Sequence, residues 1–233
     1  MAVTFVNQEK NYDVGTSTTI TAPPGGAGGD VLIFSLFCND NPGEIAVPSG
    51  FEYLTQQSND GTGGIHMIFF KINTGNEPSS YSTTWDNTSS FISVVMAFRG
   101  ADVSAGTPIE NYGGVSGEYD NSTYLGVYFD TYTAGTMVVA IAVADLKSSG
   151  TGIDALYDAQ SIVTMTSPAQ FGGPIESELP IMRTGYGICS ASPATEPSVL
   201  SLDDPNSGNM VVLNILSESS TFTPITIVNI STS

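Results

Sequence analysis

The chain has 233 residues, of which 40% are hydrophobic and only 12% are charged, whereas about 25% is typical of globular domains. Its 23 acidic residues outnumber the 5 basic ones and leave a net charge of -18. Nucleic-acid phosphates and anionic lipid surfaces should repel such a chain, so we expect neither nucleic acid nor a membrane as its partner. The length is sufficient to bury a core without a metal ion or disulfide bonds.

The chain carries no segment that predicts secretion or membrane insertion. Its first ten residues have neither a basic start nor an apolar stretch, so no signal peptide is expected. The longest aliphatic run, Met137–Ala144, is much shorter than the ~20 residues that span a bilayer. Cys38 and Cys189 each end an apolar run, and we expect both to be buried, reduced thiols because no secretory signal points to an oxidising compartment.

Apolar residues alternate with polar ones or run continuously over short segments, and Gly, Pro, Asn and Asp bound these segments. This pattern is typical of β-strands. In chain order the predicted strands are Val3–Gln8, Ser17–Ala22, Val31–Cys38, Phe51–Gln56, Ile65–Ile72, Tyr81–Trp85, Phe91–Arg99, Tyr124–Thr131, Thr136–Ala144, Ser161–Thr166, Pro180–Cys189, Met210–Ser217 and Phe222–Ile230. One helical candidate, Ile153–Gln160, could form two turns at most.

The segments between the predicted strands are rich in turn-forming residues. Ala22–Asp30 (APPGGAGGD) and Asn39–Glu44 (NDNPGE) supply the fixed φ of Pro, the positive φ of Gly and side-chain hydrogen-bond acceptors. Many short strands separated by such turns, without intervening helices, predict an antiparallel β-sandwich of the jelly-roll type. No linker or internal repeat divides the chain, so residues 1–233 are expected to form one domain.

His66 is the only histidine and therefore the first candidate for a catalytic base. If Ile65–Ile72 is a strand, then His66, Ile68 and Phe70 share one face. That face is typical of a core, and a hydrogen-bonded histidine near its end fits better than a base. No spacing typical of a zinc site accompanies His66, because the sequence has no HxxxH and no CxxC.

Other catalytic patterns are also missing. Gly114–Gly117 (GVSG) lacks the spacing of a GxSxG nucleophile elbow. The glycines of Gly25–Gly29 precede a predicted strand, whereas a phosphate cradle needs the start of a helix. Two carboxylates placed for glycoside hydrolysis could arise by chance among 23. We therefore predict no enzymatic activity, no catalytic residue, no cofactor and no bound metal ion.

Two kinds of binding site remain open. Asn39-Asp40-Asn41 and Asp203-Asp204 could offer oxygen ligands to Ca²⁺, although neither matches an EF-hand loop and ordinary turns are the commoner explanation. Tyr112, Tyr119 and Tyr124 could stack on sugar rings, but tyrosines at these positions more often pack within a sheet or at a protein interface.

A series of short motifs runs in order through the first half of the chain. Gly29-Asp30-Val31-Leu32 opens a predicted strand, and Pro48-Ser49-Gly50-Phe51 follows. The series continues with Leu54, Met67–Lys71 (MIFFK), Glu77-Pro78 and Tyr81, and it ends with Phe98-Arg99-Gly100-Ala101-Asp102 and Thr107-Pro108-Ile109. It resembles the β-sandwich proteins found among the head- and tail-associated components of tailed-phage virions. The match is good over about residues 1–110 and loose beyond them, and Phe51 stands where Trp is more usual.

The resemblance implies a virion component with an all-β fold, and it implies no enzymatic activity. Each motif also has a structural explanation: Gly29 and Gly50 shape turns, Phe51 enters the core, and Arg99, one of only five cations, is expected to pair with a carboxylate. No motif residue is therefore predicted to be a catalytic or ligand-binding residue.

We expect a non-enzymatic protein on the surface of the phage particle, in the form of a capsid decoration or knob-like subunit. It would be assembled in the host cytoplasm, contact capsid or tail subunits and form a homo-oligomer. One alternative is a tail-tip protein that binds a receptor or a glycan of the host surface. A glycan hydrolase is a third hypothesis, because some jelly-roll proteins are enzymes, and fold alone does not decide between the three.

Overall fold

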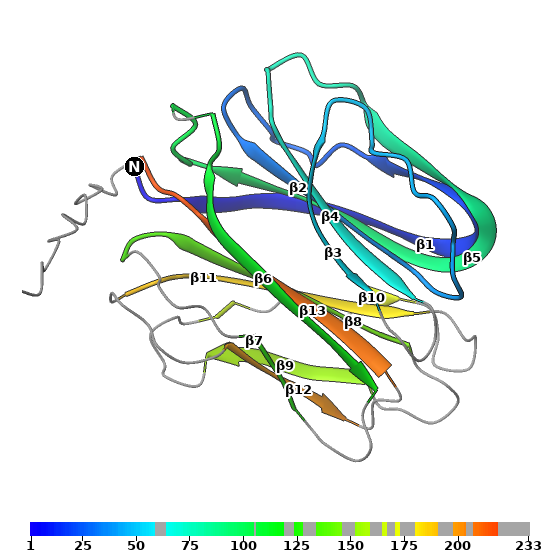
Figure 1. The fold of residues 1–233 in the computed structure, drawn as a ribbon. Coiled ribbons are helices and arrows are strands. Elements are labelled where there is room, and N and C mark those ends of the chain that lie inside the picture. Colours follow the sequence, from blue (N-terminus) through cyan, green and yellow to red (C-terminus); the bar gives the residue numbers. More distant parts are fainter. Residues whose placement is uncertain are drawn as a thin grey trace, which may run out of the picture.

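The computed structural model describes residues 1–58, 64–104, 106–118, 124–127, 134–145, 152–158, 165–166, 171–172, 180–190, 198–203 and 207–218. Over these residues the chain forms strands β1 to β13 in three sheets that lie over one another as layers (Figure 1). Neighbouring strands are antiparallel throughout, and the described residues contain no helix. The predicted all-β antiparallel sandwich is confirmed.

The first sheet is built from the first hundred residues alone. Its strand order is β1 (Thr4–Thr21), β5 (Ser80–Arg99), β2 (Val31–Cys38), β4 (Ile65–Ile72) and β3 (Glu52–Ser58). The bounds of β2 and β4 are those predicted, because both are continuous apolar runs that the sheet buries almost completely. The residues over which the motif resemblance is good, about 1–110, therefore include the whole of this sheet.

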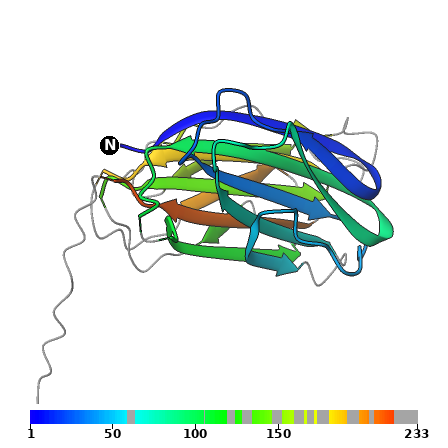
Figure 2. The same ribbon diagram turned by 90° about the horizontal axis from the view of Figure 1, so that it is seen from above.

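Strands β1 and β5 each join two segments that were predicted as separate strands, so the prediction was wrong there. The polar residues between the predicted segments stay in strand conformation because each strand supplies the other with hydrogen-bond partners along nearly its whole length. Gly15 pairs with Ser89 and Ser17 with Thr84, so the register shifts at this point. Such an irregularity bends a strand pair, and both strands curve strongly (Figure 1, Figure 2).

The second and third sheets come from the second half of the chain. The second has the order β10 (Phe171–Gly172), β11 (Ile181–Ile188), β8 (Met137–Asp145), β13 (Ser207–Ile215) and β6 (Ile109–Glu118). The third has the order β7 (Tyr124–Val127), β12 (Ser198–Asp203) and β9 (Gly152–Asp158). The third sheet lies on the far side of the second from the first (Figure 1).

The sequence prediction failed more often in this half. Strand β9 replaces the helical candidate Ile153–Gln160, because pairing with β12 outweighs a weak helical preference. Strands β6, β10 and β12 were not predicted, and the three glycines of β6 hid its pattern. The predicted strand Phe222–Ile230 lies outside the described residues, as does Ser161–Thr166 except for its last two positions, of which Thr166 bridges to Tyr186.

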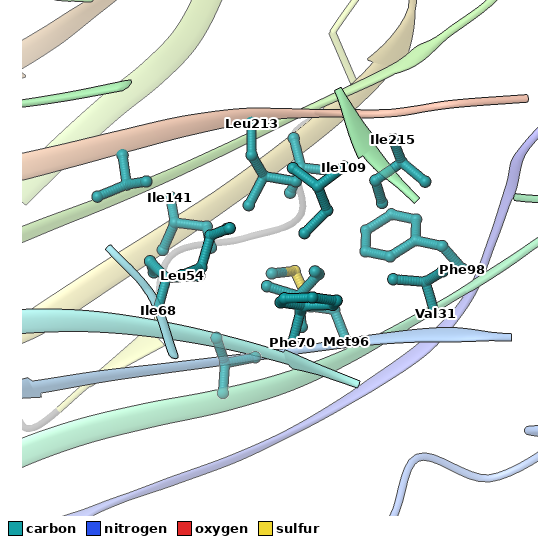
Figure 3. Close-up of a cluster of buried hydrophobic side chains, with 14 of the residues drawn as sticks. Val31, Leu54, Ile68, Phe70, Met96, Phe98, Ile109, Ile141, Leu213 and Ile215 are labelled. Atoms are coloured by element: carbon teal, nitrogen blue, oxygen red, sulfur yellow. The ribbon is translucent and has the colours of Figure 1, made fainter. Parts of the chain in front are cut away.

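A continuous apolar core fills the space between the first and second sheets (Figure 3). Alternate residues of each strand point into it, so that one face of each sheet is buried against the other. Members labelled in the figure are Val31, Leu54, Ile68, Phe70, Met96, Phe98, Ile109, Ile141, Leu213 and Ile215. Phe5 of β1 stacks on Tyr186 of β11 with ring centroids 4.4 Å apart, which closes one side of this core.

A second core covers the outer face of the first sheet. The curved ends of β1 and β5 bring Ile20, Tyr81 and Trp85 over this face, and the segment between β2 and β3 adds Ile45 and Phe51. The indole Nε1 of Trp85 donates a 2.8 Å hydrogen bond to the carbonyl of Gly15, at the register shift. Both faces of the first sheet are therefore buried, which explains why β2 is apolar at almost every position.

Candidate functional site

His66 lies inside the core between the first and second sheets and is completely buried. Its Nε2 atom is 2.8 Å from the hydroxyl oxygen of Ser35, and its Nδ1 atom has no hydrogen-bond partner. Burial lowers the pKa of His66 to about 3, because a charged imidazolium is poorly solvated there. The expected strand-end core position is confirmed, and in this conformation the ring cannot reach a substrate at the surface.

Asp30 of the Gly29–Leu32 motif and Arg99 of the Arg-Gly-Ala-Asp motif form an ion pair. Both Nε and Nη2 of Arg99 donate hydrogen bonds of 2.9 Å to the Asp30 carboxylate, and Nη2 also donates to the carbonyl of Gly25. The backbone N–H of Ala27 donates to the same carboxylate. The hydrogen bonds from Arg99 to Asp30 raise the pKa of the guanidinium. The expectation that Arg99 pairs with a carboxylate is confirmed.

Lys71 and Glu77 form a second ion pair, which is more deeply buried. The Nζ atom of Lys71 is 2.6 Å from a carboxylate oxygen of Glu77, and both side chains are about nine-tenths buried. The hydroxyl of Tyr81 and the backbone N–H of Thr74 also donate to this carboxylate, each over 3.0 Å. Burial alone would raise the pKa of Glu77, but hydrogen bonds from Lys71, Thr74 and Tyr81 outweigh it and lower the pKa.

Aromatic rings enclose the ammonium group of Lys71. Its Nζ atom lies 5.6 Å from the centroids of both the Phe51 and the Tyr81 rings, within the range of a cation–π interaction. Burial and the neighbouring Glu77 carboxylate raise the pKa of Tyr81. A Cβ atom at Gly50 would lie only 3.1 Å from Nζ, and its φ of +79° suits glycine. The Pro-x-Gly-Phe motif therefore makes room for the lysine and supplies one of its rings.

The two ion pairs stand side by side at one end of the first sheet. The backbone N–H of Gly29 donates to the carbonyl of Asn73, and the N–H of Asn73 donates to the carbonyl of Asp30. These bonds join the loop before β2 to the loop after β4. The four residues of the two ion pairs, which span 69 positions from Asp30 to Arg99, are thus brought to one end of the sheet, and each pairs with another motif residue.

The Arg-Gly-Ala-Asp motif, Arg99–Asp102, connects the first sheet to the second. Ala101 forms a β-bridge with Ser217, and the backbone N–H of Asp102 donates to the carbonyl of Leu216. Asp102 also accepts hydrogen bonds from the N–H and hydroxyl of Ser104, which lower its pKa. The Arg-Gly-Ala-Asp motif therefore holds the chain where it passes from the first sheet to the second.

The remaining candidates give no assembled site among the described residues. Asp40 and Asn41 both have positive φ in the loop after β2. In the part of the chain that the structure describes, no three His, Cys, Asp or Glu residues are grouped so that they could hold a metal ion. Asp203 ends β12, whereas Asp204 lies outside the described residues.

The predicted tyrosines are placed only in part. The Tyr112 side chain is 47% exposed on β6, the edge strand of the second sheet. Tyr124 begins β7, and Tyr119 lies outside the described residues. Sequence analysis missed two further exposed tyrosines, Tyr12 on β1 and Tyr53 on β3. Their strands are the two edges of the first sheet, which the sequence alone does not reveal.

Both cysteines are buried and neither forms a disulfide bond, as expected. Burial raises the pKa of the Cys38 thiol far above its ordinary value, so the reactive thiolate is scarce at neutral pH. Across the described ranges, no helix is long and apolar enough to cross a membrane. Comparisons with protein-family models, curated proteins and solved structures find no match to this chain.

Proposed function

We propose that the protein is a non-enzymatic structural component of a tailed-phage virion, where it decorates the capsid surface as a knob-like subunit. The observation that carries this proposal is the role of the motif residues that resemble phage virion sandwiches. Asp30, Arg99, Lys71 and Glu77 are used in ion pairs inside the fold. The motifs therefore support a shared architecture, and a role in assembly requires no catalytic group.

The surface favours attachment through uncharged contacts. With only 5 Lys and Arg residues against 23 acids, the protein has few cations with which to bind an acidic partner. Strands β1, β3 and β6 lie at sheet edges, and each carries one exposed tyrosine: Tyr12, Tyr53 and Tyr112. Edge strands offer backbone hydrogen bonds, and tyrosines are enriched at protein interfaces. We therefore expect these edges to contact the capsid.

Adding the purified protein back to particles that lack it tests the proposal. At a net charge of -18, the subunits repel one another and an acidic shell, and salt screens this repulsion over a Debye length of ~10 Å at about 0.1 M. The number of copies bound per head should therefore hold or rise from low to moderate salt. A sharp loss of binding with rising salt would show that attraction between opposite charges dominates and would contradict the proposed mode of attachment.

The same experiment distinguishes the tail-tip alternative, which the exposed tyrosines also permit. Binding to tails or host cells, with none to heads at any salt concentration, would replace decoration by receptor or glycan binding. Tyr53→Ser and Tyr112→Ser are the variants to compare, because both side chains are about half exposed and their loss should leave folding intact. Loss of head binding in either variant, with unchanged thermal unfolding, would assign that edge to the interface.

A further inference from the structure

His66 occupies an unusual position for the only histidine of an acidic chain. It lies between two packed sheets with no exposed surface. The Phe37 ring stands edge-on to it with centroids 6.4 Å apart. Its hydrogen-bond partner, Ser35, also lies 4.0 Å from the sulfur of Met182, which belongs to the second sheet. The imidazole is thus enclosed by both sheets at this end of the sandwich.

The polar neighbours of His66 that the structure describes are neutral. Ser35 can donate or accept one hydrogen bond, and Gln57 is opposite His66 on β3. Asn209 faces the same core from β13, in register with Val143 and hence with Met182. Its side-chain amide is buried without a hydrogen-bond partner, like Nδ1 of His66. None of these groups offers a negative charge to an imidazolium.

The strand register places the nearest charged residues of the described strands beside, and not directly opposite, the partners of His66. Lys10 on β1 is opposite Val94 and exposed, and Glu52 on β3 is opposite Phe70, four residues along β4 from His66. Asp145 of β8 and Glu118 of β6 both pair with Ser207, two positions beyond Asn209. Arg183 follows Met182 on β11, and consecutive residues of a strand point to opposite faces, so Arg183 belongs to the face of the second sheet away from this core.

We propose that His66 is an acid-sensitive latch between the first and second sheets. A proton on its imidazole places a charge in a core where, among the side chains that the structure describes, no counter-charge lies next to it. Water can reach that charge only if the sheets separate at the Ser35–His66 end. The closed sandwich is therefore the neutral-histidine form, and mild acid favours opening there.

The direction of the pH effect follows from the two states of the ring. Burial holds the pKa of His66 at about 3 in the folded protein, against 6.5 for the ordinary group. Below about pH 6.5 His66 is therefore protonated in the unfolded chain but still neutral in the folded chain. The free energy of unfolding is highest above about pH 6.5 with respect to this group, and it falls as the pH drops toward 3. Glu77 and Asp102, whose pKa values are lowered, lose their stabilising charge only below about pH 4.5.

The test is urea unfolding of the wild type and of His66→Gln between about pH 7 and pH 5. For the wild type, the equilibrium constant of unfolding should rise about tenfold for each pH unit below 6.5. His66→Gln keeps a neutral hydrogen-bonding group and should remove this slope. Ser35→Ala is the matched control, because it removes the hydrogen bond but keeps the titrating ring: it should lower stability with the slope unchanged.

Equal slopes in the wild type and His66→Gln would overturn the proposal. If His66→Gln does not fold, the ring protons of His66 in the wild type decide by NMR. A folded-state signal that titrates near pH 6.5 would contradict the latch. A signal that stays in its neutral position until the protein opens would support it. Hydrogen exchange of the β2 and β4 amides then reports whether opening begins at this end.

Discussion

Asp30 and Arg99 lie 69 positions apart in the sequence, and the guanidinium of Arg99 donates two parallel hydrogen bonds of 2.9 Å to the carboxylate of Asp30. The two side chains differ in exposure: Asp30 is 2% exposed and Arg99 is 44% exposed. The buried carboxylate therefore depends on a partner that stands half in solvent. Asp30 also holds the turn at Ala27, so the pair fixes the loop that leads into β2.

Replacing Arg99 by Ala should lower the thermal unfolding midpoint by several degrees. The substitution leaves the buried Asp30 carboxylate with only its hydrogen bond from the backbone N–H of Ala27. An ion pair that loses one partner in this way destabilises the fold, because the remaining buried charge has no counter-charge. Arg99→Lys should lose less, because it keeps the charge but not the two parallel hydrogen bonds. Differential scanning calorimetry measures both variants. Equal midpoints for the wild type and Arg99→Ala would show that the pair contributes no stability.

Replacing Lys71 by Met should destabilise the protein by about 2–4 kcal/mol. The Glu77 carboxylate is about nine-tenths buried and would lose its cation, and the rings of Phe51 and Tyr81 would lose their cation–π partner. The double variant Lys71→Met with Glu77→Gln should recover part of that loss, because no unpaired charge remains. Chemical unfolding at neutral pH gives both values, and a double variant less stable than Lys71→Met would contradict this explanation.

Gly100→Ala should be clearly more harmful than Gly106→Ala. The two glycines have nearly the same φ, +81° and +79°, so the conformational cost of a side chain is about 1 kcal/mol at both. A Cβ atom at Gly100 would lie 2.7 Å from the backbone carbonyl oxygen of Ala2, whereas at Gly106 it would meet nothing within 4 Å. The difference between the thermal unfolding midpoints of the two variants therefore measures the clash with the Ala2 carbonyl alone. Equal decreases in the midpoint would show that the N-terminal segment moves aside.

Both cysteines should be reduced and inaccessible in the folded protein. Cys38 and Cys189 are buried and form no disulfide bond, so thiol reagents should detect few groups before denaturation. After denaturation without a reductant, the titration should report both thiols. A titration near zero under both conditions would establish a disulfide bond and contradict the structure.

The sequence predicted the first sheet far better than the rest. Strands β2 and β4 are apolar at nearly every position, and their predicted bounds agree with the structure. Strand β6 was missed because its glycines carry no hydrophobic signal. One of them lies close to the first sheet: a Cβ at Gly114 would lie 2.5 Å from the side chain of Gln57 on β3, which would have to shift. The helical expectation at β9 failed because pairing with β12, far along the chain, decides its conformation.

The candidate site was predictable in kind but not in arrangement. The rarity of cations indicated that Arg99 pairs with a carboxylate, and the face shared with Ile68 placed His66 in a core. Neither argument could identify Asp30 as the partner or Ser35 as the hydrogen-bond partner of His66. These contacts join different strands, so they depend on strand order and register.

By itself, then, the amino-acid sequence determined the fold class, the acidic surface and the core positions of β2 and β4, because hydrophobic period and turn chemistry act over a few neighbouring residues. Only the tertiary structure decided that β1 and β5 are single curved strands, that both faces of the first sheet are buried, and that Lys71 sits between two rings against Glu77. These features are contacts between distant parts of the chain. Their energies arise only when packing brings the partners together and removes water from between them.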